Sequence, residues 1–408
     1  MKSRSLSSGF DAMASASLRA RRNDLLSWGH SRLLLRFVAL LFIALMALSA
    51  RAAEPNPRPR DGRDARTLYH TACAACHGED GAGGARADLG FTPPETFPDF
   101  SDCSQATPEQ DVAWRAMVRG GGRARGFSEI MPAFGDALDE AQIADLVRHL
   151  RSFCHEPGWP RGELNVPRAM LTEKAFPEDE LVVSVGADVH RPRAVDGELG
   201  YEHRIGRVSQ LEIAVPFSSQ PGAAGARETG AGDVAIGLKR VLHSRYEDAT
   251  TLASIFAVQG EVSLPTGSER RGLGAGTTVF TVFGAYDQLL PRRGFLQMQG
   301  GLDVPADSSK ADTTIFLRSA LGFSISEHGG SGRTWSPMIE LAGERPTGGD
   351  AETTWDLAPG LQVTLSARQH VRLALGWLKP LTQHTERESR LLAYVLWDWA
   401  DGGLLEGW

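Results

Sequence analysis

The chain has 408 residues, of which 42% are hydrophobic and 23% charged, and this composition excludes a mainly disordered protein. Its formal net charge is −7. The first 52 residues carry eight Lys/Arg and two Asp, so the remainder of the chain carries −13. Such an acidic surface argues against binding to nucleic acid or to anionic lipid. The 45 glycines favour a fold with many tight turns over a helical bundle.

Residues 1–52 have the features of a secretory signal peptide. Twelve consecutive apolar residues, Phe37 to Leu48, follow a basic region, and Ala50-Arg51-Ala52 has the small-x-small form of a signal-peptidase site. A membrane-spanning helix needs about 20 apolar residues, although an uncleaved anchor is the alternative. We therefore expect export, a linker over residues 53–61, and cysteines that mature under oxidising conditions.

Residues 62–157 contain all four cysteines and show helical periodicity. The sequence "DEAQIADLVRHLRSF" places Ile143, Leu146, Val147 and Leu150 on one face of a helix, with Asp139 as its N-cap. This segment is predicted to be a small all-α domain. A Pro-rich linker over residues 158–180, which we expect to pack on a neighbouring element, separates it from the rest of the chain.

Residues 181–408 alternate between apolar and polar side chains with a period of two. In one of several such segments, Leu211, Ile213, Val215 and Phe217 face away from Glu212. We expect roughly 10–12 antiparallel strands, so the chain is predicted to be a multidomain α + β protein. A soluble sandwich would turn the apolar face into its core. A barrel in the outer membrane would turn that face toward lipid.

The motif "ACAACHG" carries the chemistry of the helical segment. Cys73, Cys76 and His77 form C-x-x-C-H, which is typical of covalent haem attachment, because thiols one helical turn apart can each bind one vinyl group while the histidine binds the iron. A structural zinc site needs a second ligand pair, and the sequence has no other C-x-x-C. A redox dithiol needs a βαβ context, whereas the surroundings here are helical.

Two stretches, "TLYHTACAACHGEDGAG" and "IMPAFGDALDEAQIADLVRHLRSF", resemble the class I cytochrome c family. The resemblance implies one covalent haem c on Cys73 and Cys76, with His77 as the proximal ligand and Met131 as the distal one. His/Met ligation raises the reduction potential and suits one-electron transfer better than catalysis. His149 and His155 are the rival distal ligands.

Cys103 and Cys154 lie outside the haem motif and are the candidates for a disulfide in an oxidising compartment. The family does not require such a bridge. Residues 62–157 carry nine Arg and fifteen Asp/Glu, which would favour a basic redox partner protein, although the charge could equally be solvated surface.

The segments "GAGDVAIGLKRVL" and "GEVSLPTGSERRGLGAGTTVFTVFGAYDQLL" resemble bacterial outer-membrane channels related to the phenol-degradation transporter family. In such a barrel the lumen-facing side chains would be Gln259, Glu261, Gln297, Arg318, Glu340 and Gln362. We expect an exported electron carrier, not an enzyme, with its haem domain in the periplasm and its barrel in the outer membrane. The alternatives are a small-molecule channel with the haem domain as sensor or plug, and an enzyme that uses the haem as a relay.

Overall fold

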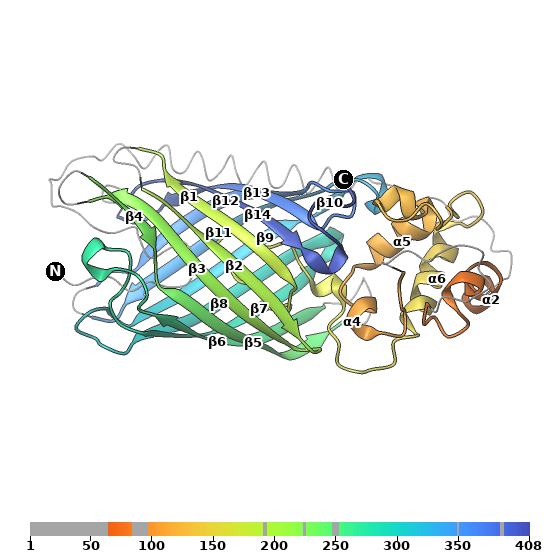
Figure 1. Ribbon diagram of the computed structural model, residues 1–408, viewed down its shortest axis with the longest axis horizontal. Helices are drawn as coiled ribbons and strands as arrows, with labels where there is room; N and C mark the ends of the chain where they lie inside the picture. Colours follow the sequence, from red (N-terminus) through yellow and green to blue (C-terminus); the bar gives the residue numbers. More distant parts are fainter. Residues whose placement is uncertain are drawn as a thin grey trace.

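The protein consists of a small helical domain and a long β-barrel (Figure 1). The computed structural model describes residues 64–83, 97–190, 194–222, 226–246, 253–348, 351–383 and 387–408. The predicted signal peptide (residues 1–52) and the linker after it (53–61) lie outside these residues. No helix within the described part of the chain has the length and apolarity to cross a membrane.

The helical domain packs short helices around one apolar core. The helices are α2 (Ala65–Ala72), α3 (Ala74–His77), α4 (Cys103–Ala106), α5 (Asp111–Gly120), the 3-10 turn η1 (Gly122–Arg125) and α6 (Glu140–Arg151). The N-cap prediction for α6 is confirmed, since the Asp139 carboxylate accepts the N–H of Gln142 in a capping box. The predicted apolar stripe of α6 is buried against Tyr69 and Val118.

The β-half is a closed antiparallel barrel of twelve strands, which confirms the barrel over the sandwich. The strands are β1 (Glu180–Asp188), β2 (Val195–Ile205), β3 (Ser209–Pro221), β5 (Val234–Arg245), β6 (Ser254–Leu264), β7 (Val279–Leu290), β8 (Gly294–Pro305), β9 (Thr314–Phe323), β11 (Thr334–Pro346), β12 (Thr354–Thr364), β13 (Val371–Pro380) and β14 (Arg390–Asp398). β1 pairs with β14 and β9 with β11, which closes the barrel. The short strands β4 (Arg227–Ala231) and β10 (Ile325–Ser326) extend β3 and β11.

Side chains alternate between the outside and the lumen along each strand. In β9, Ile315 and Leu317 are each 48% exposed, whereas Phe316 and Arg318 between and beside them are buried. The six side chains predicted to face the lumen are all buried: Gln259, Glu261, Gln297, Arg318, Glu340 and Gln362. The exposed face is apolar in the other strands as well, with Val183, Leu199, Ile236, Leu238, Phe280, Val282, Leu341, Leu375, Leu391 and Val395 among its side chains.

Residues 164–178, within the predicted Pro-rich linker, run inside the barrel, and we call them the lumen segment. Leu164 and Phe176 belong to one buried cluster with Ile255 and Phe283 of the barrel wall. Val166 and Leu171 belong to further clusters with wall residues. The apolar core of the barrel is therefore built between the wall and this segment, because the outward-facing side chains of the strands do not contribute to it.

Hydrogen bonds from the wall hold the backbone of the lumen segment. The Glu340 carboxylate accepts the N–H groups of Met170 (2.7 Å), Leu171 (2.9 Å) and Thr172 (3.0 Å). The Asp287 carboxylate accepts the N–H of Ala175 at 2.7 Å. These bonds satisfy an irregular backbone that would otherwise lack partners inside the barrel.

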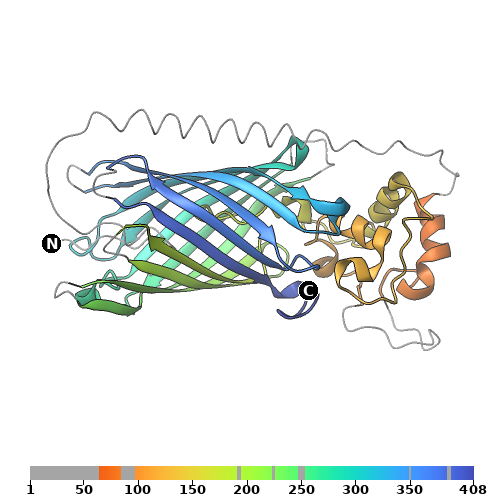
Figure 2. The same cartoon turned by 90° about the horizontal axis from the view of Figure 1, so that it is seen from above.

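The helical domain lies over one mouth of the barrel, with α5 next to the strands and α2 at the far end (Figure 1, Figure 2). Arg125 is buried in this contact, where its Nη1 donates to the Gly330 carbonyl (2.9 Å) and its Nη2 to the Arg368 carbonyl (3.2 Å). Arg368 Nε donates in return to the Gly126 carbonyl at 3.0 Å. Two reciprocal arginines thus fasten the domain to the barrel.

The two ends of the barrel differ in their turns. Beside the helical domain, residues 206–208 and 291–293 make short connections and residues 324–333 a longer one, and residues 399–408 lie there too. The longest connection, residues 265–278, lies at the opposite end. The lumen segment enters from the side of the helical domain.

Candidate haem site

The C-x-x-C-H motif spans the junction of α2 and α3. Asp64 caps α2 by accepting the N–H of Thr67 at 2.7 Å, and the buried Tyr69 hydroxyl donates to the Gly78 carbonyl at 2.6 Å. Gly78 ends α3 with a φ of 81°, a left-handed conformation that suits glycine. Asp64 and Tyr69 before the motif and Gly78 after it therefore stabilise the conformation of the motif.

His77 lies in an apolar, aromatic environment. Its side chain is buried, and its ring stacks on Phe97 with centroids 5.0 Å apart and lies 5.0 Å from the ring of Phe100. Burial lowers the pKa of His77 to about 4, so the imidazole is neutral at physiological pH. Its Nδ1 is buried without a hydrogen-bond partner among the described residues. A neutral imidazole is the form that binds a metal.

Cys73 and Cys76 are both free thiols, half-buried on one helical turn. Burial, with a smaller contribution from Cys76, raises the pKa of the Cys73 thiol to about 11. Cys73 is therefore protonated at neutral pH and is a weak nucleophile, unlike the thiols of redox-active dithiols, whose pKa is lowered.

Met131 lies in the loop between η1 and α6. The Gly122 N–H donates to the Met131 carbonyl at 3.1 Å. A Cβ on Gly122 would come within 1.9 Å of the Ser128 carbonyl oxygen, so the close approach of the loop requires glycine there. Three residues after Met131, Phe134 packs on the same core cluster as Cys73. The loop and the motif thus border one core.

The rival distal ligands are placed differently. His149 is half-buried on α6, where its ring lies 5.4 Å from that of Tyr69 and 5.1 Å from that of Phe153. His155 is exposed. His149 thus packs against the rings of Tyr69 and Phe153.

Cys103 and Cys154 are joined by a disulfide, with their Cα atoms 5.1 Å apart. The bond ties α4 to the residues that follow α6, across 51 positions of sequence. It leaves the two thiols of the C-x-x-C-H motif as the pair available for another group.

These residues fit a haem. A buried imidazole nitrogen without a partner is unusual in a folded protein, and a prosthetic group beside the ring would account for it. The donor set of two thiols and one neutral imidazole, next to the rings of Phe97 and Phe100, is also the chemistry that a covalently bound porphyrin needs.

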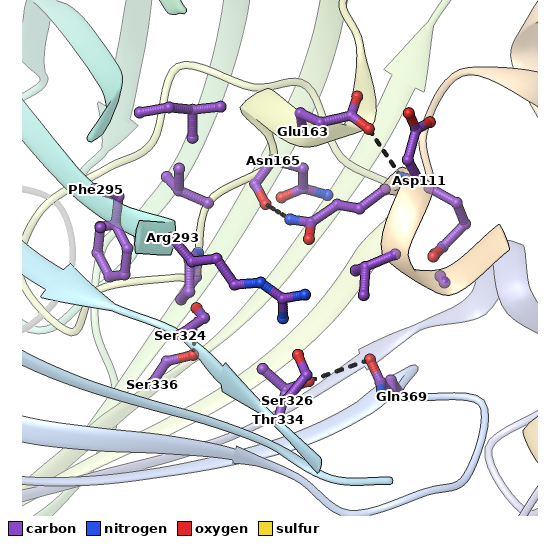
Figure 3. A pocket seen from close by; sticks show the side chains of 18 of the residues that line it. Asp111, Glu163, Asn165, Arg293, Phe295, Ser324, Ser326, Thr334, Ser336 and Gln369 are labelled. Atoms are coloured by element: carbon purple, nitrogen blue, oxygen red, sulfur yellow. Dashed lines mark hydrogen bonds between the residues drawn. The ribbon is translucent and has the colours of Figure 1, made fainter. Parts of the chain in front are cut away.

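A second feature lies where the helical domain meets the barrel, and the sequence motifs gave no sign of it. A cavity of about 570 Å³ is enclosed by the N-terminal end of α5, the start of the lumen segment and the turn between β7 and β8 (Figure 3). The Arg293 guanidinium projects into it (Figure 3). We call it the mouth cavity.

The comparisons with known proteins bear on both halves of the chain. Residues 60–150 match the family model described as cytochrome C oxidase, cbb3-type, subunit III. Residues 60–150 form a cytochrome c domain. The match confirms the expected cytochrome c resemblance, and it implies haem c as the cofactor.

Several solved structures resemble the barrel. The COG4313 outer membrane channel from Pseudomonas putida F1 is 15% identical, with 55% of this chain and 97% of that chain covered and a TM-score of 0.42. A KdgM porin is 8% identical over 53% and 98% of the two chains, with a TM-score of 0.33. Outer membrane phospholipase A from Escherichia coli is 9% identical over 55% and 97%, with a TM-score of 0.32. No curated protein matches the chain. Because the sequence identities and TM-scores are this low, any inference about the barrel depends on its own strands.

Proposed function

We propose that this protein is an exported c-type cytochrome that transfers single electrons at the periplasmic face of the outer membrane, where its barrel holds it. The observation that carries the proposal is the position of the C-x-x-C-H motif, on α2 and α3 at the pole of the cytochrome domain farthest from the barrel (Figure 1). A redox partner protein in the periplasm would reach that pole without meeting the membrane.

The surface of the barrel supports a place in the outer membrane. Its strands are 9 to 13 residues long, and their outward side chains are mainly Leu, Ile, Val and Phe. Trp335 and Trp397 lie near the strand ends beside the cytochrome domain, and Trp355 and Trp377 lie toward the opposite end. Aromatic residues at both ends of an apolar band are typical of membrane interfaces.

The lengths of the turns support an orientation of the barrel in which the cytochrome domain faces the periplasm. In outer-membrane barrels the periplasmic turns are short and the extracellular loops longer. The short turns 206–208 and 291–293 lie on the side of the cytochrome domain, and residues 265–278 lie on the other side. This contrast favours a periplasmic position for the cytochrome domain.

We assign the haem ligands from this chain's own residues. Cys73 and Cys76 would hold one haem c through thioether bonds, His77 would bind the iron on the proximal side, and Met131 on the distal side. When bound, the haem supplies a one-electron couple. Tyr69 and Gly78 fix the direction of the His77 side chain, and Phe97 and Phe100 keep water from its ring.

This ligand set favours an electron carrier over an enzyme. If His77 and Met131 both held the iron, they would leave no place for a substrate to bind it. One haem also cannot carry electrons across a hydrocarbon core about 30 Å thick. We therefore propose electron exchange between periplasmic partners, with the barrel as an anchor.

The alternative, an open channel for small molecules, is less well supported. The lumen segment packs against the wall through Leu164, Val166, Leu171 and Phe176, and Glu340 holds its backbone. A lumen filled in this way favours a closed barrel over a conducting one.

The test of ligation is the replacement Met131→Ala in the haem-loaded protein. Loss of the iron–sulfur bond should abolish the weak near-infrared absorption band and lower the reduction potential. Met117→Ala is the matched control, because Met117 is the other methionine of residues 62–157 and lies within α5. A band that survives in Met131→Ala and disappears in Met117→Ala would reverse the assignment.

The test of localisation is fractionation of the cells that express the protein. The full-length chain should be found with the outer membrane and should migrate differently on a gel before and after heating, because a closed barrel resists denaturation by detergent. Recovery as a soluble periplasmic protein would rule out the anchoring role.

A further inference from the structure

The mouth cavity is a built pocket between two parts of the molecule. Its volume of about 570 Å³ falls within the range of small-molecule sites, roughly 300–1,000 Å³. One wall is the first turn of α5, a second is the start of the lumen segment near Asn165, and a third is the turn 291–293 with the neighbouring strands. A ligand there would touch the cytochrome domain and the barrel at once.

The carboxylates of the cavity are already paired. Asp111 lies 3.1 Å from Arg151 Nε and 3.0 Å from Arg161 Nη2. Glu163 lies 3.3 Å from Arg161 Nε and accepts the Asp111 N–H at 2.8 Å. Glu109 is the remaining acidic residue of the lining. The acidic side chains on this wall therefore contribute little net negative charge to the cavity.

The arginines of the cavity differ in their partners: Arg372 has the carboxylates of Asp398 and Glu178 nearby, whereas no such partner lies beside Arg293 among the described residues. Arg115, Arg292, Arg293 and Arg372 all line it. The Arg293 guanidinium stands in the open space with no ion pair or side-chain hydrogen bond to the described residues (Figure 3). Partial burial, and to a smaller extent the nearby Arg115, lowers the pKa of Arg293.

The backbone that presents Arg293 is unusual. Arg292 and Arg293 have φ values of 61° and 59°, in the left-handed region that glycine and asparagine normally occupy. Two consecutive arginines in such a turn are unfavourable for local folding. Strained residues of this kind concentrate where a side chain has a function.

Neutral polar groups complete the lining opposite α5. The Ser324 and Ser336 hydroxyls lie 2.9 Å apart, and those of Ser326 and Thr334 lie 3.0 Å apart (Figure 3). A hydroxyl that now bonds to its neighbour can rotate and donate to an anion instead. Ligand binding would therefore leave none of these four hydroxyls without a hydrogen-bond partner.

We propose that the mouth cavity binds a small oxyanion, a molecule that bears a carboxylate or a phosphate, through Arg293 and Arg115. The guanidinium groups would bind its anionic oxygens, and the serine and threonine hydroxyls would bind its remaining polar atoms. This site is independent of the haem. If no anion binds in the mouth cavity, the electron-transfer proposal still stands. If the protein does not transfer electrons, the anion site is unaffected.

Calorimetry on the full-length protein in detergent, at low ionic strength, tests the site. The probes are succinate and inorganic phosphate, with glucose as a neutral control. We expect saturable binding of at least one anion and none of glucose. Arg293→Asn should weaken that binding by about tenfold or more, since a hydrogen bond to a charged group contributes about 1.5–3 kcal/mol. Asparagine tolerates the left-handed turn, so the variant should melt at the same temperature as the wild type or higher.

Arg123→Asn is the matched control, because this arginine is 84% exposed, pairs only loosely with Glu129 and lies outside the cavity. It should bind the anion like the wild type. If Arg293→Asn fails to assemble, Arg115→Gln provides the second test and should weaken binding in the same direction. Absence of saturable binding by both anions, equal binding of glucose, or unchanged affinity in the arginine variants would overturn the proposal.

Discussion

At the scale of single residues, the chemistry of the cytochrome domain depends on what surrounds the motif. Tyr69 and Gly78 hold the turn around His77, while Phe97 and Phe100 exclude water from its ring. Burial keeps His77 neutral and Cys73 protonated. Neither state follows from the letters C-x-x-C-H alone, because both arise from desolvation in the folded domain.

A pH-sensitive residue lies at the contact between the two domains. His370 is buried in the turn after β12, with its Nδ1 3.0 Å from the Ser366 hydroxyl and its Nε2 3.1 Å from the Gly403 carbonyl. Burial lowers the pKa of His370, and Arg368 and Arg372 act in the same direction. The unfolded chain therefore takes up the proton more readily than the folded one.

We predict that the free energy of unfolding falls as the pH drops below about 6.5, the ordinary pKa of histidine, and that His370→Gln makes this fall smaller. Thermal unfolding in detergent at about pH 7.5 and pH 5.5 measures the difference. Equal losses of stability in the wild type and the variant would show that His370 has no part in it.

At the scale of elements, the lumen segment acts as the core of the barrel. Most soluble barrels fill their interior with side chains from the strands, whereas here residues 164–178 supply Leu164, Val166, Leu171 and Phe176. Three consecutive N–H groups converge on Glu340 alone. This carboxylate is thus one polar attachment of the segment, beside the ion pairs of Arg168 with Glu180 and Glu202.

Glu340→Ala should release the lumen segment. It removes the acceptor of three N–H groups, two of them in buried hydrogen bonds, and each buried hydrogen bond left unmade costs about 1–3 kcal/mol. Planar bilayers should show little conductance with the wild type and frequent opening with the variant. Glu388→Ala, at an exposed position in the turn before β14, is the control and should stay closed. If Glu340→Ala stays as closed as the wild type, then other contacts hold the segment.

The disulfide between Cys103 and Cys154 should stabilise the cytochrome domain. Closing a loop of 51 positions contributes about 4 kcal/mol in the chain-entropy picture. The double variant Cys103→Ala/Cys154→Ala should lower the free energy of unfolding of this domain by an amount of that order. Denaturant titration, monitored by the haem absorption, measures the difference. A reductant should destabilise the wild type and leave the variant unchanged; equal effects on both would contradict the assignment.

At the scale of the whole molecule, the chain is a barrel with a cytochrome c domain fixed to one mouth. Arg125 and Arg368 donate across the contact in opposite directions, so the cytochrome domain cannot swing freely from its linker. The linker itself is immobilised inside the barrel. Such an attachment would keep the haem motif at a constant distance from the barrel, as the proposed electron exchange requires.

The proposed orientation, with the cytochrome domain in the periplasm, predicts which parts of the protein are accessible from outside the cell. An epitope inserted between Ser308 and Ser309, exposed in the turn 306–313, should be labelled by antibody on intact cells. Protease should degrade the cytochrome domain only after the outer membrane is permeabilised. Degradation of the domain on intact cells, with the epitope hidden, would invert the orientation.

Local patterns were enough to predict much of this protein. The C-x-x-C-H motif lies within five residues, the stripe of α6 has a helical period, and each strand alternates with a period of two, so Gln259, Glu340 and Gln362 could be assigned to the lumen before the fold was known. The alternation predicts 10–12 strands, and the barrel has twelve, an even number as in other barrels of this type.

The sequence by itself determined that a helical segment with a haem-attachment motif precedes a run of antiparallel strands, because short-range spacing encodes helices, strands and the C-x-x-C-H chemistry. Only the tertiary structure decided that residues 164–178 fill the barrel, and that Arg293 and Arg115 share a cavity. The Glu340 contact to Met170 joins residues 170 positions apart, and the mouth cavity exists only where both domains meet. Such contacts depend on how the whole chain packs, and no local period records them.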